Sequence, residues 1–408
     1  MSNSGYILTK KNDRKSVWKF LAEELKPKGK LFTPFNLISI PVIILGIILI
    51  IIRFTSGLGA VTNLTQEVPW GLWKGFNVVT GVAFAGGAYV VTFMVYILNM
   101  KQYKPIVRAT VLNGFLAYMF YAGALVLDLG RPLSIINPII GNDFGVSSVL
   151  FLVAWHFLLY MIAQLIEFSP AVAEWVGARR AHKILSGMTL AAVIFGITLS
   201  TLHQSGLGAL FLMAREKIHP LWYSEWIPIL FFVSSIFAGL SMVIFEGSIS
   251  YKVFSGQINE KNKKAHRGIL HGLSKVCTMA LFVYLFLQVL NFVHSKNWEY
   301  LGTRMGNWYL LEIIGFVVVP MILFFYSYRR QNILLIRAAA IMTIIGIIIN
   351  RLNISIIGFQ WDAVQQYYPT WKEFVVSLTI IFIEIWIFRW IIRRLPVLSD
   401  SPGWAKDK

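Results

Sequence analysis

Apolar stretches about as long as a membrane is thick recur along the whole sequence. A helix needs roughly 17–25 mostly apolar residues to cross the hydrocarbon layer. Such stretches lie at 36–53, 76–98, 107–127, 147–166, 184–203, 226–246, 271–293, 308–326, 333–350 and 374–392. Because backbone polar groups in lipid must be satisfied internally, the sequence predicts an all-α integral membrane protein with ten transmembrane helices.

The composition agrees with a membrane protein and argues against nucleic-acid binding. Hydrophobic residues make up 57% of the chain and charged residues 14%. The net charge of +18 is not gathered in one patch, because the basic residues alternate with the apolar stretches. We therefore expect contacts with anionic membrane lipids and no nucleic-acid partner.

The basic residues also predict the orientation. An even number of spans puts both termini on one side of the membrane. Most of the 37 Lys and Arg residues lie in the amino-terminal tail and in the connections on that same side. The positive-inside rule then places both termini in the cytoplasm of a multi-pass protein of the bacterial inner membrane.

A weak internal repeat suggests how the helices are grouped. Phe-Ala-Gly occurs eleven residues after Trp73 and again eleven residues after Trp226, four helices later. Small residues let membrane helices approach closely, so we expect two parallel-related four-helix bundles with the first and last helices flanking them. The expected units are a cytoplasmic basic tail 1–35, the first helix and outer loop 36–75, the first bundle 76–204, an outer loop and the second bundle 205–350, and the tenth helix with its flanks 351–408.

The segments between helices differ on the two sides. The outer loops, expected at 54–75, 128–146 and 204–225, are rich in Trp and Pro. Trp is enriched at membrane interfaces as an anchor, and clustered with Gly and Pro it could also form a docking floor for an extrinsic partner. The segments 1–30 and 250–268 are polar and basic, and we expect them to be solvated in the cytoplasm.

The single cysteine limits the redox groups that this chain can hold. Iron–sulfur clusters and c-type haem need several thiolates or a Cys-x-x-Cys-His run, whereas Cys277 stands alone in an apolar stretch. We therefore predict no iron–sulfur cluster and no metal site in this subunit. A b-type haem needs facing histidines, and His203 with His294 is the one candidate pair.

Ionisable residues inside membrane helices are costly, so each is a functional candidate. The set spans the whole membrane thickness: Asp128, His203 and Arg351 near the outer ends, His156 and Glu384 near the middle, and Glu167 and Glu246 near the inner ends. With Tyr118, these groups could form a proton relay. Alternatively, the inner carboxylates pair with nearby Lys or Arg and carry no protons.

The outer polar residues suit a second task. A quinone head group needs hydrogen-bond donors and a proton source, and its tail needs an apolar slot. His203, Asp128, Arg351 and Tyr118, with a Trp wall from Trp70 and Trp73, could supply these groups. The same residues could instead only close helix ends. A secondary transporter and a purely structural anchor are further alternatives, although the anchor leaves His156 and Glu384 without a role.

The motifs, taken in order, resemble the NrfD-type membrane subunits of the polysulfide reductase superfamily, and most closely the HybB-type subunits of periplasmic nickel-iron hydrogenases. The resemblance covers nearly the whole chain. Its motifs are Thr55-Ser56-Gly57-Leu58-Gly59, Pro69-Trp70-Gly71, Asp128-x-Gly130-Arg131, Leu202-His203-Gln204-Ser205, His219-Pro220-Leu221-Trp222, Ile244-Phe245-Glu246-Gly247-Ser248 and Tyr368-Pro369-Thr370-Trp371, followed by Glu384.

This resemblance implies a haem-free, quinone-reactive subunit of an oxidoreductase complex. It would bind menaquinone near the periplasmic side and exchange electrons with a periplasmic iron–sulfur partner. That partner would connect to a nickel-iron hydrogenase or, in relatives, to a molybdopterin enzyme or a multihaem cytochrome. The family pattern also implies proton translocation through residues that match Tyr118, His203, Glu246 and Glu384.

Two positions depart from the family pattern. Leu152 stands where close members carry a Glu, and Asn77 stands where an acidic residue is usual. His156 is one helical turn inward from Leu152 and is expected on the same face, so it could replace the missing carboxylate.

Overall fold

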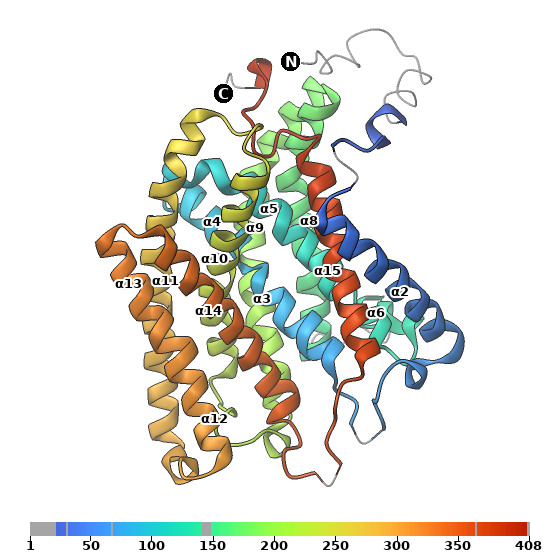
Figure 1. The fold of residues 1–408 in the computed structure, drawn as a ribbon, viewed down its shortest axis with the longest axis vertical. Helices are drawn as coiled ribbons and strands as arrows, with labels where there is room; N and C mark the ends of the chain where they lie inside the picture. Colours follow the sequence, from blue (N-terminus) through green and yellow to red (C-terminus); the bar gives the residue numbers. More distant parts are fainter. Residues whose placement is uncertain (1–21, 30–31, 67, 141–147, 364, 406–408) are drawn as a thin grey trace.

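Ten membrane-length helices dominate the structure, a computed structural model that describes residues 22–29, 32–66, 68–140, 148–363 and 365–405 (Figure 1). The spans are Pro34–Ser56, Trp73–Ile97, Lys101–Asp128, Val149–Val176, Arg179–Leu212, Ile227–Val253, Glu260–His294, Arg304–Arg330, Ile333–Ile357 and Trp371–Ile392. The prediction of an all-helical membrane protein with ten spanning helices is confirmed. We call the end of the protein opposite the described chain termini the outer end.

Some spans are continuous α-helices and others are broken. The continuous ones are α2 (Pro34–Ser56), α8 (Val149–Val176), α9 (Arg179–Leu212), α10 (Ile227–Val253), α11 (Glu260–His294) and α15 (Trp371–Ile392). The second span consists of η2 (Trp73–Gly81), α3 (Val82–Phe84), α4 (Gly86–Thr92) and η3 (Phe93–Ile97), and the third of η4 (Lys101–Tyr103), α5 (Lys104–Ala117), η5 (Tyr118–Ala122) and α6 (Leu125–Asp128). The eighth consists of α12 (Arg304–Ile313), η10 (Ile314–Val318) and α13 (Val319–Arg330), and the ninth of α14 (Ile333–Leu352) and η11 (Asn353–Ile357).

The segments η2, η3, η5, η10 and η11 are π-helical. A π-helical turn shifts the side chains that come after it around the helix axis, and such turns are frequent at functional sites. Here η2 packs against η5, and η11 packs against η2. The π-helical turns of the second, third and ninth spans therefore meet in the outer half of the protein.

Local sequence explains where the outermost helices begin. The Thr33 side chain accepts a hydrogen bond from the Asn36 amide, and Pro34 occupies the first turn of α2, where its missing N–H costs nothing. At α15, Thr370 and Glu373 form a reciprocal capping box. Both helices thus start at polar residues that satisfy free backbone amides.

Several helices extend beyond the predicted bounds. Gln204, Ser205 and Gly206, expected in an outer loop, lie inside α9, which continues to Leu212. A side chain at Gly206 would press on Val153 of α8, so the glycine serves close helix packing rather than a turn. The predicted connection 250–268 was also too long, because α10 runs to Val253 and α11 starts at Glu260. Position 147, the expected start of the fourth span, lies outside the described residues.

The helices pack in two groups. In the first group α4 packs on α5, α5 on α8, α8 on α9 and α9 on α4. In the second, α10 packs on α11, α11 on α13, α13 on α14 and α14 on α10, while α2 and α15 pack together at the flank. The parallel relation of two bundles, and the assignment of the termini to the cytoplasm, stay predictions.

The two groups meet through their Phe-Ala-Gly motifs. A side chain at Gly239 of α10 would overlap the backbone of Gly86 and Gly87 on α4. Beside this contact, the hydroxyls of Tyr89 and Ser235 lie 2.8 Å apart. The close helix approach predicted from the paired motifs is thus confirmed, and the motifs contact each other.

Both ends of the described chain lie together at one end of the helices, at the top of Figure 1. The Arg394 side chain, after α15, donates to the Glu24 carbonyl at 2.5 Å. This contact ties the amino-terminal segment to the carboxyl-terminal one.

Candidate functional site

Asp128, a predicted quinone ligand at the outer end of the third span, is held in an ion pair. Lys74 Nζ lies 2.5 Å from Asp128 Oδ2, and Asp128 is only 3% exposed. Arg53 of α2 donates to the Leu127 carbonyl at 2.6 Å and to the Leu129 carbonyl. Because the last carbonyls of a helix lack intrahelical partners, Arg53 caps α6 while Lys74 neutralises Asp128. Sequence reasoning did not single out Lys74.

A cluster of buried polar and aromatic residues lies deeper in the first group of helices. We call Tyr118, Tyr160, Gln164, His203 and Gln204 the first polar cluster. The Tyr118 ring lies 5.4 Å from the His203 ring and 4.8 Å from the Tyr160 ring. Gln164 donates to the Tyr160 hydroxyl at 3.2 Å, and Gln204 donates to the Val82 carbonyl at 2.9 Å. The cluster therefore joins four spans.

His203 is the member of this cluster best placed for proton transfer. Its Nδ1 lies 3.1 Å from the Val153 carbonyl, which can only accept, so the hydrogen bond places the proton on Nδ1. The Nε2 atom is buried and has no hydrogen-bond partner among the residues that the structure describes. The neutral ring thus presents a lone pair on Nε2, which can accept a proton from a ligand hydroxyl or from water.

Other polar atoms near this region also lack a complete set of partners. The Tyr118 hydroxyl lies beside Ser200 and Gln204. On η2, Asn77 is fully buried, and within the described part of the chain neither its amide nitrogen nor its amide oxygen has a hydrogen-bond partner. Buried polar groups without partners are rare and point to a ligand or an ordered water. These atoms fit a head group that offers carbonyl or hydroxyl oxygens.

His156 lies near the first polar cluster, and its charge would be felt by His203. Its Nδ1 is buried, and no described residue forms a hydrogen bond with it. Leu152, one turn away on α8, is 40% exposed and faces outward. A carboxylate at 152 would thus lie at the surface of the first group, whereas His156 is only partly exposed.

Arg351 belongs to a different cluster from the other predicted quinone ligands. Its guanidinium donates to Ser234 Oγ at 2.6 Å and to Asn350 Oδ1 at 3.0 Å, and it stacks over the Phe231 ring at 3.5 Å. Asn350 in turn donates to Glu312 Oε1 at 2.7 Å. Arg351 therefore faces partners in the second group of helices rather than His203 or Asp128.

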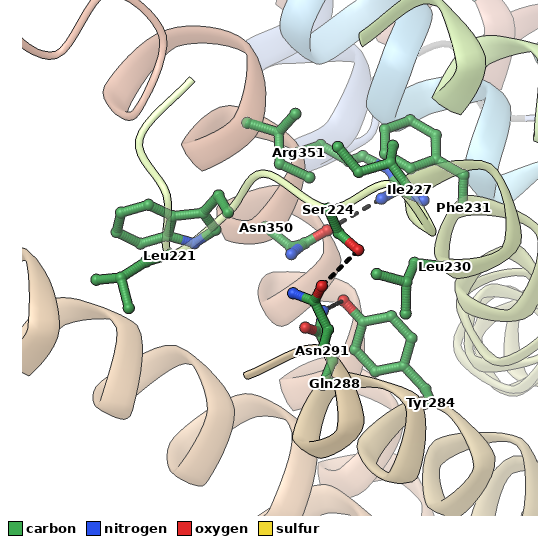
Figure 2. Close-up of a pocket in the computed structure, with 12 residues that line it drawn as sticks. Leu221, Ser224, Ile227, Leu230, Phe231, Tyr284, Gln288, Asn291, Asn350 and Arg351 are labelled. Carbon is green, nitrogen blue, oxygen red and sulfur yellow. Dashed lines mark hydrogen bonds between the residues drawn. The ribbon is translucent and has the colours of Figure 1, made fainter. Parts of the chain in front are cut away.

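Figure 2 shows part of this second polar cluster, around a small cavity lined by Arg351, Asn350, Tyr284, Gln288, Asn291 and Ser224. Gln288 donates to the Tyr284 hydroxyl at 2.7 Å, and Ser224 donates to Asn291 at 2.7 Å. The cavity has a volume of about 10 Å³, room for roughly one water molecule. It is too small for a quinone head group.

Glu312 is the functional candidate that sequence reasoning missed. It accepts hydrogen bonds from Trp222 at 2.7 Å, Asn350 at 2.7 Å and Asn353 at 2.5 Å, and is 3% exposed. The sequence could have identified Glu312, because a carboxylate within the apolar stretch 308–326 is as costly as any other charge inside a membrane helix.

Two of the predicted relay carboxylates, Glu246 and Glu384, come together. They are close enough to interact electrostatically, although they lie on α10 and α15. The Tyr121 hydroxyl donates to Glu384, and the Asn113 side chain bonds Glu246. Glu246 also lines a cavity with His266, towards the inner end.

Glu167, the third predicted relay carboxylate, lies apart from this pair. One of its oxygens, Oε1, is buried and lacks a hydrogen-bond partner among the described residues. It lines an inner cavity with Arg108 and Tyr96 rather than the Glu246 cavity. The structure thus places the inner carboxylates at two separate positions.

Trp70 and Trp73, predicted as a quinone wall, take different roles. Trp70 packs on Phe211 of α9 and on Phe359, with ring centroids 5.3 and 5.9 Å apart. It also lines a cavity of about 840 Å³ at the outer end. Trp73 is buried and donates to the Glu373 carbonyl at 3.0 Å, so it fixes the start of α15.

The outer cavity lies between the first and last outer loops and the eighth and ninth spans. Tyr367 lines it and donates to the Glu373 carboxylate. Burial, with this carboxylate, holds the pKa of Tyr367 above its usual range, so its hydroxyl stays protonated. Leu311, Ile357 and Phe374 line the same cavity and are exposed on the protein surface, which leaves it an apolar side opening.

The His219-Pro220-Leu221-Trp222 motif holds outer loops together. The His219 ring lies 4.7 Å from the Trp361 ring and 5.3 Å from the Tyr300 ring. Burial lowers the pKa of His219, which favours the neutral ring. Its Nδ1 accepts a hydrogen bond from the Leu221 amide at 3.2 Å, so this histidine serves loop structure.

Together, the ten spans and the buried polar clusters define a multi-pass membrane protein with ionisable groups inside its helices. Residues 60–363 match the family described as polysulphide reductase, NrfD, and the chain belongs to that family.

Three relatives align over most of their length. A protein of Nitratidesulfovibrio vulgaris is 41% identical over 376 residues, covering 92% of this chain and 97% of the relative. The probable Ni/Fe-hydrogenase 2 b-type cytochrome subunit of Escherichia coli is 28% identical, covering 91% and 94%. The menaquinone reductase integral membrane subunit of N. vulgaris is 28% identical, covering 85% and 87%.

Proposed function

We propose that this chain is the quinone-reactive membrane subunit of a respiratory redox complex, and that it exchanges electrons between menaquinone and a periplasmic iron–sulfur partner. The observation that carries the proposal is the buried, unpartnered Nε2 of His203 beside Tyr118. A quinone supplies two-electron, two-proton chemistry. The name of the menaquinone reductase relative supports the same ligand class.

In this proposal, His203 and Tyr118 exchange protons and hydrogen bonds with the quinone head group. The Val153 carbonyl keeps the His203 proton on Nδ1, so Nε2 would accept one of the two protons that a quinol releases on oxidation and would return it in the reverse direction. The Tyr118 hydroxyl offers a hydrogen bond to the same head group. Lys74 and Asp128 act beside this site, by fixing the helix ends that enclose it.

The outer cavity lined by Trp70 supports an entry route for the quinone. Its volume of about 840 Å³ lies within the usual range for ligand pockets. The Trp70 ring separates this cavity from Phe211, two turns along α9 from His203. An isoprenoid tail would lie along the apolar opening at Leu311 and Phe374.

Electrons must reach the quinone from another subunit. Cys277 is buried inside α11, so this chain offers no thiolate set for an iron–sulfur cluster. We propose that a periplasmic hydrogenase-type partner docks on the outer loops. A molybdopterin or multihaem enzyme of the same superfamily is the alternative partner, and genes beside this one would distinguish them.

We also propose that the subunit holds no haem, although the E. coli relative is named a b-type cytochrome subunit. The two candidate axial ligands do not fit one haem. His203 is enclosed by the Tyr118 and Phe157 rings, whereas His294 is exposed at the end of α11. The purified subunit should therefore show no haem absorption band.

The experiment that tests the function replaces His203 with Gln in the assembled complex. Loss of a positioned base costs about 10²–10⁴-fold in rate, so quinone-linked turnover should fall at least ~100-fold while dye-linked turnover of the partner persists. His294→Gln is the matched control and should leave both activities intact. Retained quinone turnover in His203→Gln would remove His203 from the site.

A coupled function, proton translocation, is favoured by the contacts among Tyr121, Glu384 and Glu246. We propose that these groups carry protons between the inner face and the quinone site. Complex in liposomes should build a membrane potential during quinone turnover. Glu384→Gln should lower the potential per electron, whereas the exposed Glu299→Gln should not, and a wild-type complex that builds no potential would refute the coupling.

A further inference from the structure

The inner end of the first group of helices contains a second large cavity, separate from the outer one. It has a volume of about 760 Å³ and lies where α5, α8 and α9 meet the carboxyl-terminal segment. This cavity opens beside the described chain termini, at the membrane interface that the positive-inside rule assigns to the cytoplasm. Neither the quinone site nor the Tyr121, Glu384 and Glu246 contacts use it.

The charge lining this cavity is mostly positive. Both carboxylate oxygens of Glu174 already have partners. The Arg108 guanidinium donates to them at 2.7 and 2.8 Å, and His182 Nε2 lies 3.0 Å from Glu174 Oε1. Three further cations line the cavity, namely Lys104, Arg179 and Lys183. Within the described residues, none of these three forms an ion pair with a carboxylate.

Glu167, at the deeper end, does not balance these cations. Among the described residues that line the cavity, it is the only other carboxylate, so the described cations are in excess. Lys104, Arg179 and Lys183 are all exposed, which leaves them free to bind an anion at the cavity mouth. The site therefore calls for a ligand with negative charge.

The remaining wall of the cavity is apolar. Val107, Val111, Phe168 and Ala171 line it, and Tyr96 is 38% exposed beside them. Each of these four side chains is at most 7% exposed, so the apolar surface that they and Tyr96 present to the cavity is small, but a free phosphate would still leave it against water, which is unfavourable. A ligand with a charged head and hydrocarbon chains would cover both parts.

The carboxyl-terminal segment borders the charged mouth. The Trp404 ring lies 5.3 Å from the His182 ring, and the Arg179 guanidinium lies 5.6 Å from the Trp404 ring. This contact joins Arg179 to the carboxyl-terminal segment at the cavity. Basic pockets between transmembrane helices on the cytoplasmic side are known to suit anionic lipid head groups.

We infer that this inner cavity binds an anionic phospholipid, with its phosphate held by Lys104, Arg179 and Lys183 and its acyl chains against the wall of Val107, Val111 and Phe168. The occupant is a membrane lipid rather than free phosphate, because the apolar wall needs hydrocarbon to cover it.

The test compares lipid binding by two triple variants of the full-length protein. Lys104→Gln, Arg179→Gln and Lys183→Gln remove the three cations together. Lys252→Gln, Lys261→Gln and Lys264→Gln are the control, since these residues lie at the same end of the protein and do not line the cavity. Both variants lose the same charge, so a general effect of membrane attraction would affect them equally.

Binding is measured by native mass spectrometry of detergent-solubilised protein titrated with phosphatidylglycerol or phosphatidylcholine. Each Lys or Arg near an anionic membrane contributes about fivefold in affinity. The cavity variant should therefore lose on the order of a hundredfold in phosphatidylglycerol affinity, while the control loses less than about twofold and phosphatidylcholine binds neither tightly. If the triple variant does not fold, Lys183→Gln alone should weaken binding roughly fivefold.

Two results would overturn the inference. Equal losses in both triple variants would mean that only net charge matters. Inorganic phosphate that displaces phosphatidylglycerol at millimolar concentration, or that binds the cavity equally well, would make this a simple anion site. The measured readout is lipid affinity, so failure here would leave the quinone proposal standing.

Discussion

Replacing Glu312 with Gln should strongly destabilise the second group of helices. Its two carboxylate oxygens accept N–H groups from Trp222, Asn350 and Asn353, at 2.5 to 2.7 Å. An amide in the same place brings its own NH₂ group against at least one of these donors. The change also removes the carboxylate that compensates the buried charge of Arg351.

The expected cost can be worked from these contacts. Asn350 separates the two charges, so they lie roughly 7 Å apart, and at an effective dielectric constant of about 20 their attraction is worth ~2 kcal/mol. A lost hydrogen bond to a charged acceptor adds about 1–2 kcal/mol, at the lower end inside a membrane. We expect Glu312→Gln to lower the free energy of unfolding by about 3 kcal/mol.

Reversible unfolding in mixed micelles, monitored by circular dichroism, measures this cost. A double-mutant cycle with Arg351→Gln should give a coupling energy of about 2 kcal/mol, because the second change removes the charge left uncompensated by the first. The exposed Glu299→Gln is the control and should change stability by less than about 0.5 kcal/mol. A Glu312→Gln protein as stable as wild type, or a cycle with additive effects, would refute this account.

Three further changes have definite expected results. Gly239→Leu should prevent the two groups of helices from packing together, since the leucine side chain would overlap the α4 backbone. Gly315→Leu is the control and should fold normally. Size-exclusion chromatography of the two purified variants distinguishes these results. Lys74→Met leaves the Asp128 carboxylate unpaired and should lower the free energy of unfolding by about 3–5 kcal/mol. The double variant Lys74→Met, Asp128→Asn removes that unpaired charge, so its free energy of unfolding should return most of the way to the wild-type value. Burial lowers the pKa of His219 in the folded state. The stability contributed by the neutral ring is therefore complete above the unfolded-state pKa of about 6.5 and is lost as the pH falls below that value. His219→Gln should flatten the fall of the melting temperature below this pH, and an unchanged profile would show that His219 does not cause the fall.

The number and nature of the spanning helices could be predicted from sequence because they depend on local composition. Each apolar stretch must form a helix to satisfy its backbone in lipid, whatever surrounds it. The Phe-Ala-Gly motifs likewise predicted a close helix approach, since only small side chains permit one. Helix ends were less predictable, because α9 and α11 continue beyond the predicted apolar stretches into more polar sequence, which hydropathy alone does not assign to a helix.

The sequence named individual candidate residues, but it did not predict which side chains each of them contacts. Sequence position placed Asp128, His203 and Arg351 at similar depths and so suggested one site. The structure instead pairs Asp128 with Lys74, leaves His203 Nε2 unpartnered, and sets Arg351 against Glu312 through Asn350. Depth depends on distance along one helix, which the sequence records. Which side chains meet depends on the rotation and neighbours of several helices, including the π-helical turns of η2, η5 and η11, and only tertiary packing decides these.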